Sequence, residues 1–192
     1  MSWKNDQVSE QETEKILEVA SLCLDFDGDF VELGCYKGDT SLSLAEIIKN
    51  TKKELWIYDS FEGLPGKNKK DESVIGKDFQ AGELLVTKRE VKERFLRAGI
   101  RLPVIKKAWF SELENKDLPR KIAFAFLDGD FYDSIKDSLK LVEDKMSAGA
   151  KIIVHDYNNM ALPGVKVAVD EWLKNKDLKT SVYQSMIIIE GF

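Results

Sequence analysis

Carboxylates end four apolar, strand-like runs of this chain, and this spacing is the pattern best suited to chemistry. The runs end in Glu32, in Asp59, in Asp128 and in the pair His155-Asp156. In an open parallel sheet, ligands bind outside the carboxyl ends of the strands, so acids delivered to that edge describe a site. The first two acids suit a nucleoside, and the last two suit a metal ion or a reacting hydroxyl group.

The turn after Glu32 leads into a helix and contains two glycines, Gly34 and Gly38, which let the backbone approach a ligand closely. It lacks the full G-x-G-x-x-G of dinucleotide folds, and Asp39 near the helix start opposes a pyrophosphate. A ligand without phosphate and with a cationic centre therefore fits better. A plain strand-to-helix turn is the alternative interpretation.

Asp59 occupies the position at which doubly wound folds usually grip ribose hydroxyls. A carboxylate can accept both hydrogen bonds of a cis-diol, although a helix N-cap by Asp59 or Ser60 is the alternative. Further along the chain, Trp109 and Phe110 follow a short strand. These two aromatic side chains could line an adenine slot, and core packing is the equal alternative.

Asp128 and Asp156 end strands that we expect to be neighbours, close enough for their carboxylates to share a divalent ion. His155 is the only histidine, and its ordinary pKa near 6.5 suits a general base; it could also ligate a softer metal or simply end its strand with a hydrogen bond. For Asp130 we favour capping of the following helix over metal ligation.

The elements that position these acids alternate between strand and helix along the chain. Capping boxes at Ser9–Glu12 and Thr87–Glu90 predict two helix starts. Further helices are expected at 40–49, between Phe131 and Met146, and from Pro163 to 174; residues 147–150 should break the second of these. Strands are expected at 29–33, 54–59, 102–106, 122–128, 151–155, 180–183 and 185–189. The alternation predicts a doubly wound α/β sheet.

We expect one domain over residues 1–192, with a helical N-terminal segment at 1–28 and a mobile active-site loop at 60–84. The net charge of -5 and the lack of a long basic run argue against nucleic-acid binding. The sequence contains no run of about 18 apolar residues, so we expect no membrane span. The first residues also lack the apolar core of a signal peptide. Two cysteines without metal-type spacing favour a reduced, cytoplasmic protein.

Several segments together resemble the class I S-adenosylmethionine-dependent methyltransferases, and more narrowly the macrocin O-methyltransferase family, which methylates sugar hydroxyls of natural products. The resemblance covers most of the chain, from about Phe30 to Trp172. The segments that carry it are FVELGCYKGDTS at 30–41, YDSFEGLP at 58–65, LDGDFYDS at 127–134, IVHDY at 153–157, and PGV with AVD at 163–170. The run DSFEGLP is specific, whereas the turn after the first strand alone is not.

The resemblance implies a Rossmann-like, mostly parallel seven-stranded sheet with an antiparallel C-terminal strand. It also implies S-adenosylmethionine and Mg²⁺ as cofactors, and a small-molecule hydroxyl group as the methyl acceptor. Asp128 and Asp156 would bind the metal together with His155, and Asp128 or His155 would act as the base. The residues that would bind the cofactor are Glu32, Gly34, Tyr36, Gly38, Thr40, Asp59, Ser60, Phe61, Trp109, Phe110 and Asp128.

The chain departs from the family pattern in two ways. The family usually has two consecutive acids where this chain has His155-Asp156, so a third carboxylate ligand is missing. The segment before the first strand is also short. We therefore expect an acceptor site that is more open, or one that a second subunit completes in a homodimer.

Two alternative functions are open. The chain could be a metal-dependent hydrolase or phosphoesterase, or it could be a non-catalytic cofactor-binding protein.

Overall fold

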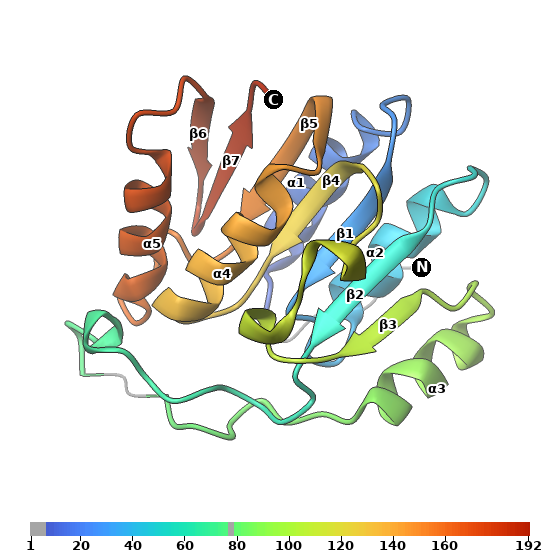
Figure 1. Ribbon diagram of the computed structural model, residues 1–192. Helices are drawn as coiled ribbons and strands as arrows, with labels where there is room; N and C mark the ends of the chain where they lie inside the picture. Colours follow the sequence, from blue (N-terminus) through green and yellow to red (C-terminus); the bar gives the residue numbers. More distant parts are fainter. Residues whose placement is uncertain (1–6, 77–78) are drawn as a thin grey trace.

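The computed structural model describes residues 7–76 and 79–192 and has one seven-stranded sheet in the order β3-β2-β1-β4-β5-β7-β6 (Figure 1). β7 alone runs against its neighbours, because it pairs antiparallel with both β5 and β6. This confirms the predicted doubly wound, mostly parallel sheet with an antiparallel C-terminal strand. The strands are β1 (Asp29–Leu33), β2 (Leu55–Asp59), β3 (Val104–Lys107), β4 (Ile122–Leu127), β5 (Met146–Val154), β6 (Lys179–Tyr183) and β7 (Met186–Glu190).

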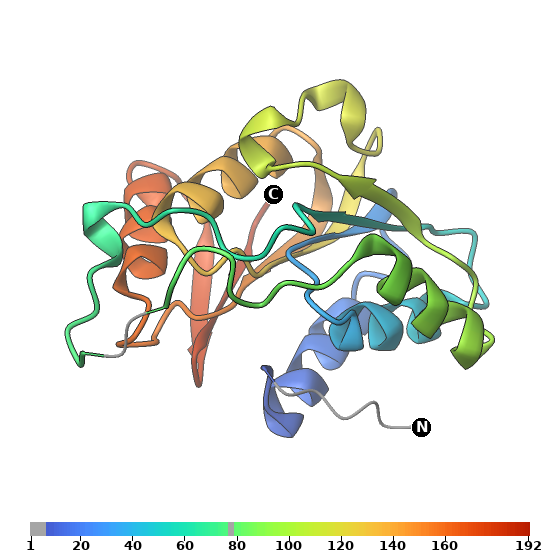
Figure 2. The same cartoon turned by 90° about the horizontal axis from the view of Figure 1, so that it is seen from below.

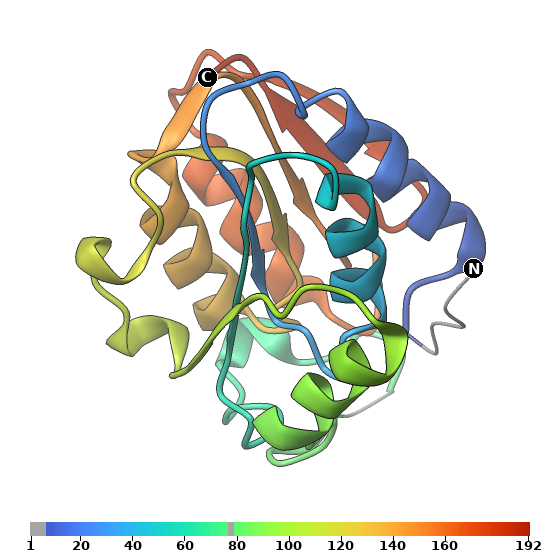
Figure 3. The ribbon, with the colours of Figure 1, turned by 90° about the vertical axis from the view of Figure 1, so that its right-hand side faces the viewer.

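Helices cover both faces of the sheet and bury two apolar layers (Figure 3). On one face lie α1 (Glu10–Ser21), α2 (Asp39–Ile48) and α3 (Lys88–Ala98); on the other lie α4 (Tyr132–Glu143) and α5 (Pro163–Leu173). Short 3-10 helices occur at η1 (Lys69–Asp71), η2 (Phe110–Glu112) and η3 (Asn115–Asp117). β4 is buried throughout, as expected of a central parallel strand.

Both predicted capping boxes are present. Ser9 and Glu12 exchange side-chain and backbone hydrogen bonds at the start of α1, and Thr87 and Glu90 do the same at the start of α3. These boxes satisfy amide groups that have no partner inside the helix, which is why the two helices begin where the sequence predicts.

The predicted helix break at 147–150 is wrong, because these residues lie inside β5. α4 ends at Glu143, and the strand begins at Met146, which pairs with Ile122 across a register shift in β4. Gly149 adopts a φ of +83°, which a glycine tolerates and most residues do not. Small residues that look like a helix break thus extend the strand through an irregularity in its pairing.

The segment between β2 and α3 crosses the carboxyl ends of the strands (Figures 1 and 2). It runs from Asp59 to the start of α4, where Asp71 of η1 accepts a hydrogen bond from the Tyr132 amide at 2.7 Å, and then returns to α3. The prediction that Asp130 caps α4 is wrong, because Asp71 takes that place. This segment therefore covers the edge at which the sequence places the site.

Candidate functional site

A cavity of about 320 Å³ lies at the carboxyl ends of β1, β2, β4 and β5, beneath the segment between β2 and α3. Its position is where an open α/β sheet binds ligands, since β1 and β4 are the neighbours at which the strand order reverses. The predicted residues that line it are Gly34, Tyr36, Asp59, Ser60, Trp109, Phe110, Asp128, His155 and Asp156. The predicted residues that do not are Glu32, Gly38, Thr40 and Phe61.

Asp59 organises the first end of this cavity. Its Oδ2 accepts hydrogen bonds from the Cys35 amide at 2.9 Å and the Tyr36 amide at 3.3 Å, and its Oδ1 accepts one from the Phe61 amide at 2.7 Å. The carboxylate thus ties the turn after β1 to the end of β2. Of the roughly four lone-pair sites of a carboxylate, these contacts use three and leave one on Oδ1 for a ligand hydroxyl group. Asp59 does not cap a helix, because the chain after it is irregular.

Glu32 lies behind the cavity rather than on its wall. It is buried, and the Ser41 hydroxyl donates a hydrogen bond to its Oε2. Burial, assisted by the nearby charges of Asp128 and Asp59, raises the pKa of Glu32 to about 8. This carboxyl group is therefore protonated near neutral pH and supports the turn from below.

The two glycines of the turn serve the backbone. Gly34 has a φ of +91°, and a Cβ at this position would lie 2.0 Å from the carbonyl oxygen of Asp128. Only a glycine therefore lets the turn pack against the end of β4. Gly38 adopts a φ of +80° at the N-cap of α2, and Thr40 is buried in the first turn of that helix.

The middle of the cavity wall is apolar and aromatic. Trp109 and Phe110 line it, as does Ser60, whereas Phe61 is buried in the core below. Most of the other apolar wall residues come from the segment after β2, from the end of β3 and from the loop before α5. They were not identified as site residues from the sequence. They are Leu64, Phe79, Leu84, Ala108 and Leu162. Such a wall can enclose a flat, aromatic ligand group.

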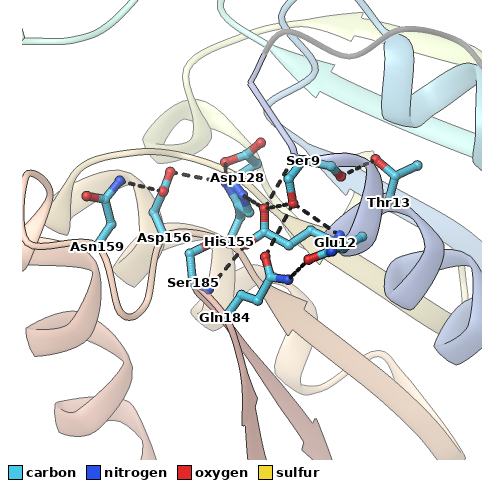
Figure 4. Close-up of polar contacts among 10 residues, drawn as sticks. Ser9, Glu12, Thr13, Asp128, His155, Asp156, Asn159, Gln184 and Ser185 are labelled. Carbon is cyan, nitrogen blue, oxygen red and sulfur yellow. Dashed lines mark hydrogen bonds and ion pairs between the residues drawn. The ribbon is translucent and has the colours of Figure 1, made fainter.

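The second end of the cavity holds Asp128, His155 and Asp156, which the fold brings together as predicted from neighbouring strands. His155 Nδ1 lies 3.0 Å from Asp128 Oδ1 and 3.1 Å from Asp156 Oδ2 (Figure 4). Asn159 donates a hydrogen bond to Asp156 at 2.8 Å, and sequence reasoning missed this residue. The arrangement is a buried imidazole with a carboxylate on each side of one ring nitrogen.

The charges around His155 decide its protonation. Burial opposes a charge on the ring, but the carboxylates of Asp128, Asp156 and Glu12 outweigh burial and raise the pKa of His155 well above its usual range. Burial likewise opposes ionisation of Asp156, but hydrogen bonds from His155 and Asn159 hold the pKa of that carboxyl below its usual range. The surrounding acids therefore favour the protonated form of the histidine.

Asp130 also lines the cavity, in a left-handed conformation with a φ of +61°. Burial first, and then the charges of Asp128 and Asp156, raise the pKa of Asp130 well above its usual range. A second carboxyl group thus faces the same space as Asp128 without joining the contacts of His155.

A divalent ion fits the spacing of Asp128, His155 and Asp156. One ligand atom from each lies within 4.8 Å of the others, and the two carboxylates supply hard oxygen ligands. The imidazole nitrogen suits borderline ions such as Zn²⁺ better than Mg²⁺, which prefers oxygen ligands alone. A metal ligand at Nδ1 must also displace the proton that the surrounding acids stabilise there.

Residues 11–187 match the sequence model of the family described as Macrocin-O-methyltransferase (TylF). The chain belongs to the macrocin O-methyltransferase family. This confirms the resemblance to class I S-adenosylmethionine-dependent methyltransferases. Among the described residues, no helix combines the length and apolar character needed to cross a bilayer.

Two curated relatives of this family member come from Streptomyces. One is an 8-demethyl-8-(2,3-dimethoxy-α-L-rhamnosyl)-tetracenomycin-C 4'-O-methyltransferase of Streptomyces olivaceus, 28% identical over 139 residues, which are 68% of this chain and 53% of the relative. The other is a demethyldecarbamoylnovobiocin O-methyltransferase of Streptomyces niveus, 28% identical over 167 residues, 79% of this chain and 60% of the relative. The chain thus spans little more than half the length of these relatives.

The solved structure of the O-methyltransferase NovP has the same fold. The two structures superpose with a TM-score of 0.77 at 24% sequence identity, over 93% of this chain and 78% of NovP. This likeness agrees with the Rossmann-like sheet described above.

Proposed function

We propose that this family member is an S-adenosylmethionine-dependent O-methyltransferase that acts on a hydroxyl group of a small molecule. The observation that carries the proposal is the cavity, which joins Asp59 at one end to Asp128, His155 and Asp156 at the other. One end suits a nucleoside and the other suits a reacting hydroxyl group. A hydrolase would need only the second end, so the Asp59 end favours the methyltransferase.

The cofactor would lie along the β1–β2 side of the cavity. Asp59 would accept a hydrogen bond from a ribose hydroxyl, with Trp109 or Phe110 beside the adenine and Ser60 near the adenosine. Gly34 and Tyr36 would follow the methionine part. Glu32 lies behind the turn and accepts a hydrogen bond from the Ser41 hydroxyl of α2, so it would connect β1 to the helix that follows the turn.

Bound S-adenosylmethionine would supply a methyl group on a positively charged sulfur, so attack by the acceptor oxygen would release S-adenosylhomocysteine as a neutral thioether. The hydroxyl proton of the acceptor would then go to the protein, which must also align the two reactants. The carboxylates around His155 raise its pKa and so favour a protonated ring, which makes His155 a poor acceptor for this proton. We therefore assign proton acceptance to Asp128, whose carboxylate lines the cavity, with His155 as the group that holds it.

Metal assistance belongs to the same proposal. Asp128, His155 and Asp156 would hold a divalent ion, which would lower the pKa of a hydroxyl group bound to it. Mg²⁺ is the ion that the resemblance implies, and the nitrogen ligand makes Mn²⁺ and Zn²⁺ the ions to compare with it.

The acceptor that we propose is a sugar hydroxyl on a glycosylated natural product. The relative from Streptomyces olivaceus is named for 4'-O-methylation of a rhamnosyl-tetracenomycin, and the relative from Streptomyces niveus is named for O-methylation of demethyldecarbamoylnovobiocin. The walls that would select the acceptor are the segments 62–82 and 157–162, which border the cavity through Leu64, Asn159 and Leu162. We also propose that the protein forms a homodimer. Sedimentation velocity at several concentrations would test this.

Calorimetric titration of S-adenosylmethionine and S-adenosylhomocysteine tests the proposed function. We expect micromolar binding of both to the unmodified protein, and loss of at least tenfold in affinity for Asp59→Ala. Asp128→Asn should bind the cofactor normally and lose methyl transfer to a rhamnosylated acceptor. Absence of binding under every metal condition, together with metal-dependent release of phosphate from a phosphoester, would replace the methyltransferase with the hydrolase.

A further inference from the structure

The imidazole of His155 has one nitrogen without a hydrogen bond. Nε2 is buried, and within residues 7–76 and 79–192 no atom lies at hydrogen-bond distance from it. The acceptor it faces is Glu12 Oε2, 3.9 Å away on the opposite side of the ring from Asp128 and Asp156 (Figure 4). Buried polar nitrogens are nearly always paired, so Glu12 is the group that must offset the buried N–H of His155 on this side.

Glu12 is itself held firmly in place. Its Oε2 accepts hydrogen bonds from the Ser9 amide at 3.2 Å and the Ser9 hydroxyl at 2.7 Å. Its Oε1 accepts hydrogen bonds from the Ser185 amide at 3.2 Å and from the Ser185 hydroxyl. Burial opposes its charge, but the nearby imidazole of His155 and the hydrogen bonds from Ser185 and Ser9 outweigh burial and hold the pKa of Glu12 far below its usual range.

The capping box alone does not account for these contacts. The box of α3 has the same pattern, with threonine in place of serine, and its Glu90 is exposed and hydrogen-bonded to Thr87. Glu12 instead is buried and reaches two further elements, the turn between β6 and β7 at Ser185 and the end of β5 at His155. A cap that needed no other role would stay in solvent, as Glu90 does.

We propose that Glu12 is a positioning residue, which holds the imidazole of His155 from its Nε2 side and so presents Nδ1 to Asp128 and Asp156. A carboxylate behind a functional histidine fixes the orientation of the ring. This inference rests on the proposed function for its catalytic consequence, but not for the contact itself.

The consequence is that α1 and the β6–β7 turn belong to the site. Gln7, just before the cap of α1, lines the cavity, so the start of this helix borders the same space. Ser185 then connects the outer strands of the sheet to His155 through Glu12. The outer strand pair would thereby influence the reacting end of the cavity without touching a substrate.

The test uses the fact that His155 is the only histidine of the chain. In protein made without a histidine tag, imidazole ¹⁵N and ¹H NMR signals report this one ring. We expect Glu12→Gln, which keeps the size and the capping ability of the side chain, to shift the ring ¹⁵N signals or to split them into two populations. Ser185→Ala should cause a smaller change of the same kind, and Glu90→Gln should cause none.

Kinetics supply the second measurement. Glu12→Gln should lower kcat about 10- to 100-fold, as expected for a partner behind a functional histidine, and leave the affinity for S-adenosylhomocysteine within about twofold. Glu90→Gln should leave both unchanged. If Glu12→Gln leaves the ring signals as in the unmodified protein, or if both Glu→Gln variants change them equally, the inference is wrong. Failure of cofactor binding in the unmodified protein would instead overturn the proposed function, and the NMR result would still decide on Glu12.

Discussion

Glu32 ends β1 as a buried carboxyl group whose hydrogen-bond donor is the Ser41 hydroxyl. Its folded pKa of about 8 lies above the value of 4.5 expected in the unfolded chain. The folded state therefore keeps a proton that the unfolded state has released. Between these pH values unfolding releases a proton, so the free energy of unfolding falls as pH rises and is highest below pH 4.5 as far as this group is concerned.

Glu32→Gln should remove this pH dependence, because glutamine keeps the hydrogen bond and cannot ionise. The difference in unfolding free energy between the variant and the unmodified protein should therefore change with pH. It should be more favourable to the variant at pH 9 than at pH 5 by on the order of 3 kcal/mol. Urea denaturation at pH 5, 7 and 9 measures this. Glu46→Gln on the exposed surface of α2 is the control and should follow the unmodified protein. Equal pH slopes for all three proteins would contradict the assignment.

Residue types at strand ends were enough to predict where Asp59, Asp128 and Asp156 would gather, because parallel strands deliver their ends to one edge. The role of Glu12 could not be predicted in this way. Its capping box is visible in the local sequence, but its contact with His155 depends on how α1 and the β6–β7 turn pack. Local patterns describe neighbours along the chain, and this contact joins distant segments.

At the scale of elements, the segment between β2 and α3 is attached to the molecule at η1. Asp71 is buried and accepts hydrogen bonds from the Tyr132 amide at 2.7 Å and the Asn68 amide at 2.9 Å. A Cβ at Gly164 would lie 1.8 Å from Asp71 Oδ1, so the carboxyl group also lies against the start of α5. One residue thus joins the loop to the first turns of two helices.

Asp71→Ala should detach this segment. It leaves the buried Tyr132 amide without an acceptor, which should lower the unfolding free energy by about 1–3 kcal/mol. Hydrogen exchange in residues 60–76 should also become faster, because the attachment of η1 is lost. Lys70→Ala removes an exposed ion pair with Glu171 and a contact of the ammonium group with the Tyr132 ring, but leaves the Tyr132 amide paired, so it should change both measurements less. Equal effects of the two substitutions would show that Asp71 does not anchor the segment.

The predicted mobility of residues 60–84 stays a prediction, and the same exchange measurement in the unmodified protein would test it. Helix starts were predictable because capping is a local property. The start of β5 was not, because residues 147–150 favour a break on their own and become strand only because the flanking Met146 and Lys151 pair with β4. The replacement of Asp130 by Asp71 at the start of α4 has the same origin, since it depends on where a long loop returns.

At the scale of the molecule, the cavity lies at the point between β1 and β4 where the strand order reverses. Its wall takes residues from β1 and β2 on one side and from β4 and β5 on the other. The two apolar layers extend along both faces of the same sheet, so the halves share one core. A ligand in the cavity contacts both halves and binds only the folded chain, and should therefore stabilise the whole domain in one transition.

S-adenosylhomocysteine at 100 times its dissociation constant should stabilise the folded protein by about 2.7 kcal/mol, which corresponds to a rise in Tm of about 5–10 °C for a domain of this size. Thermal unfolding followed by circular dichroism and by tryptophan fluorescence should give the same shift, because Trp109 lines the cavity whereas Trp172 lies on α5. Asp59→Ala should lose the shift at the same ligand concentration. A shift seen by fluorescence alone would mean that the ligand orders the cavity wall without stabilising the sheet, and would contradict a binding site that joins its two halves.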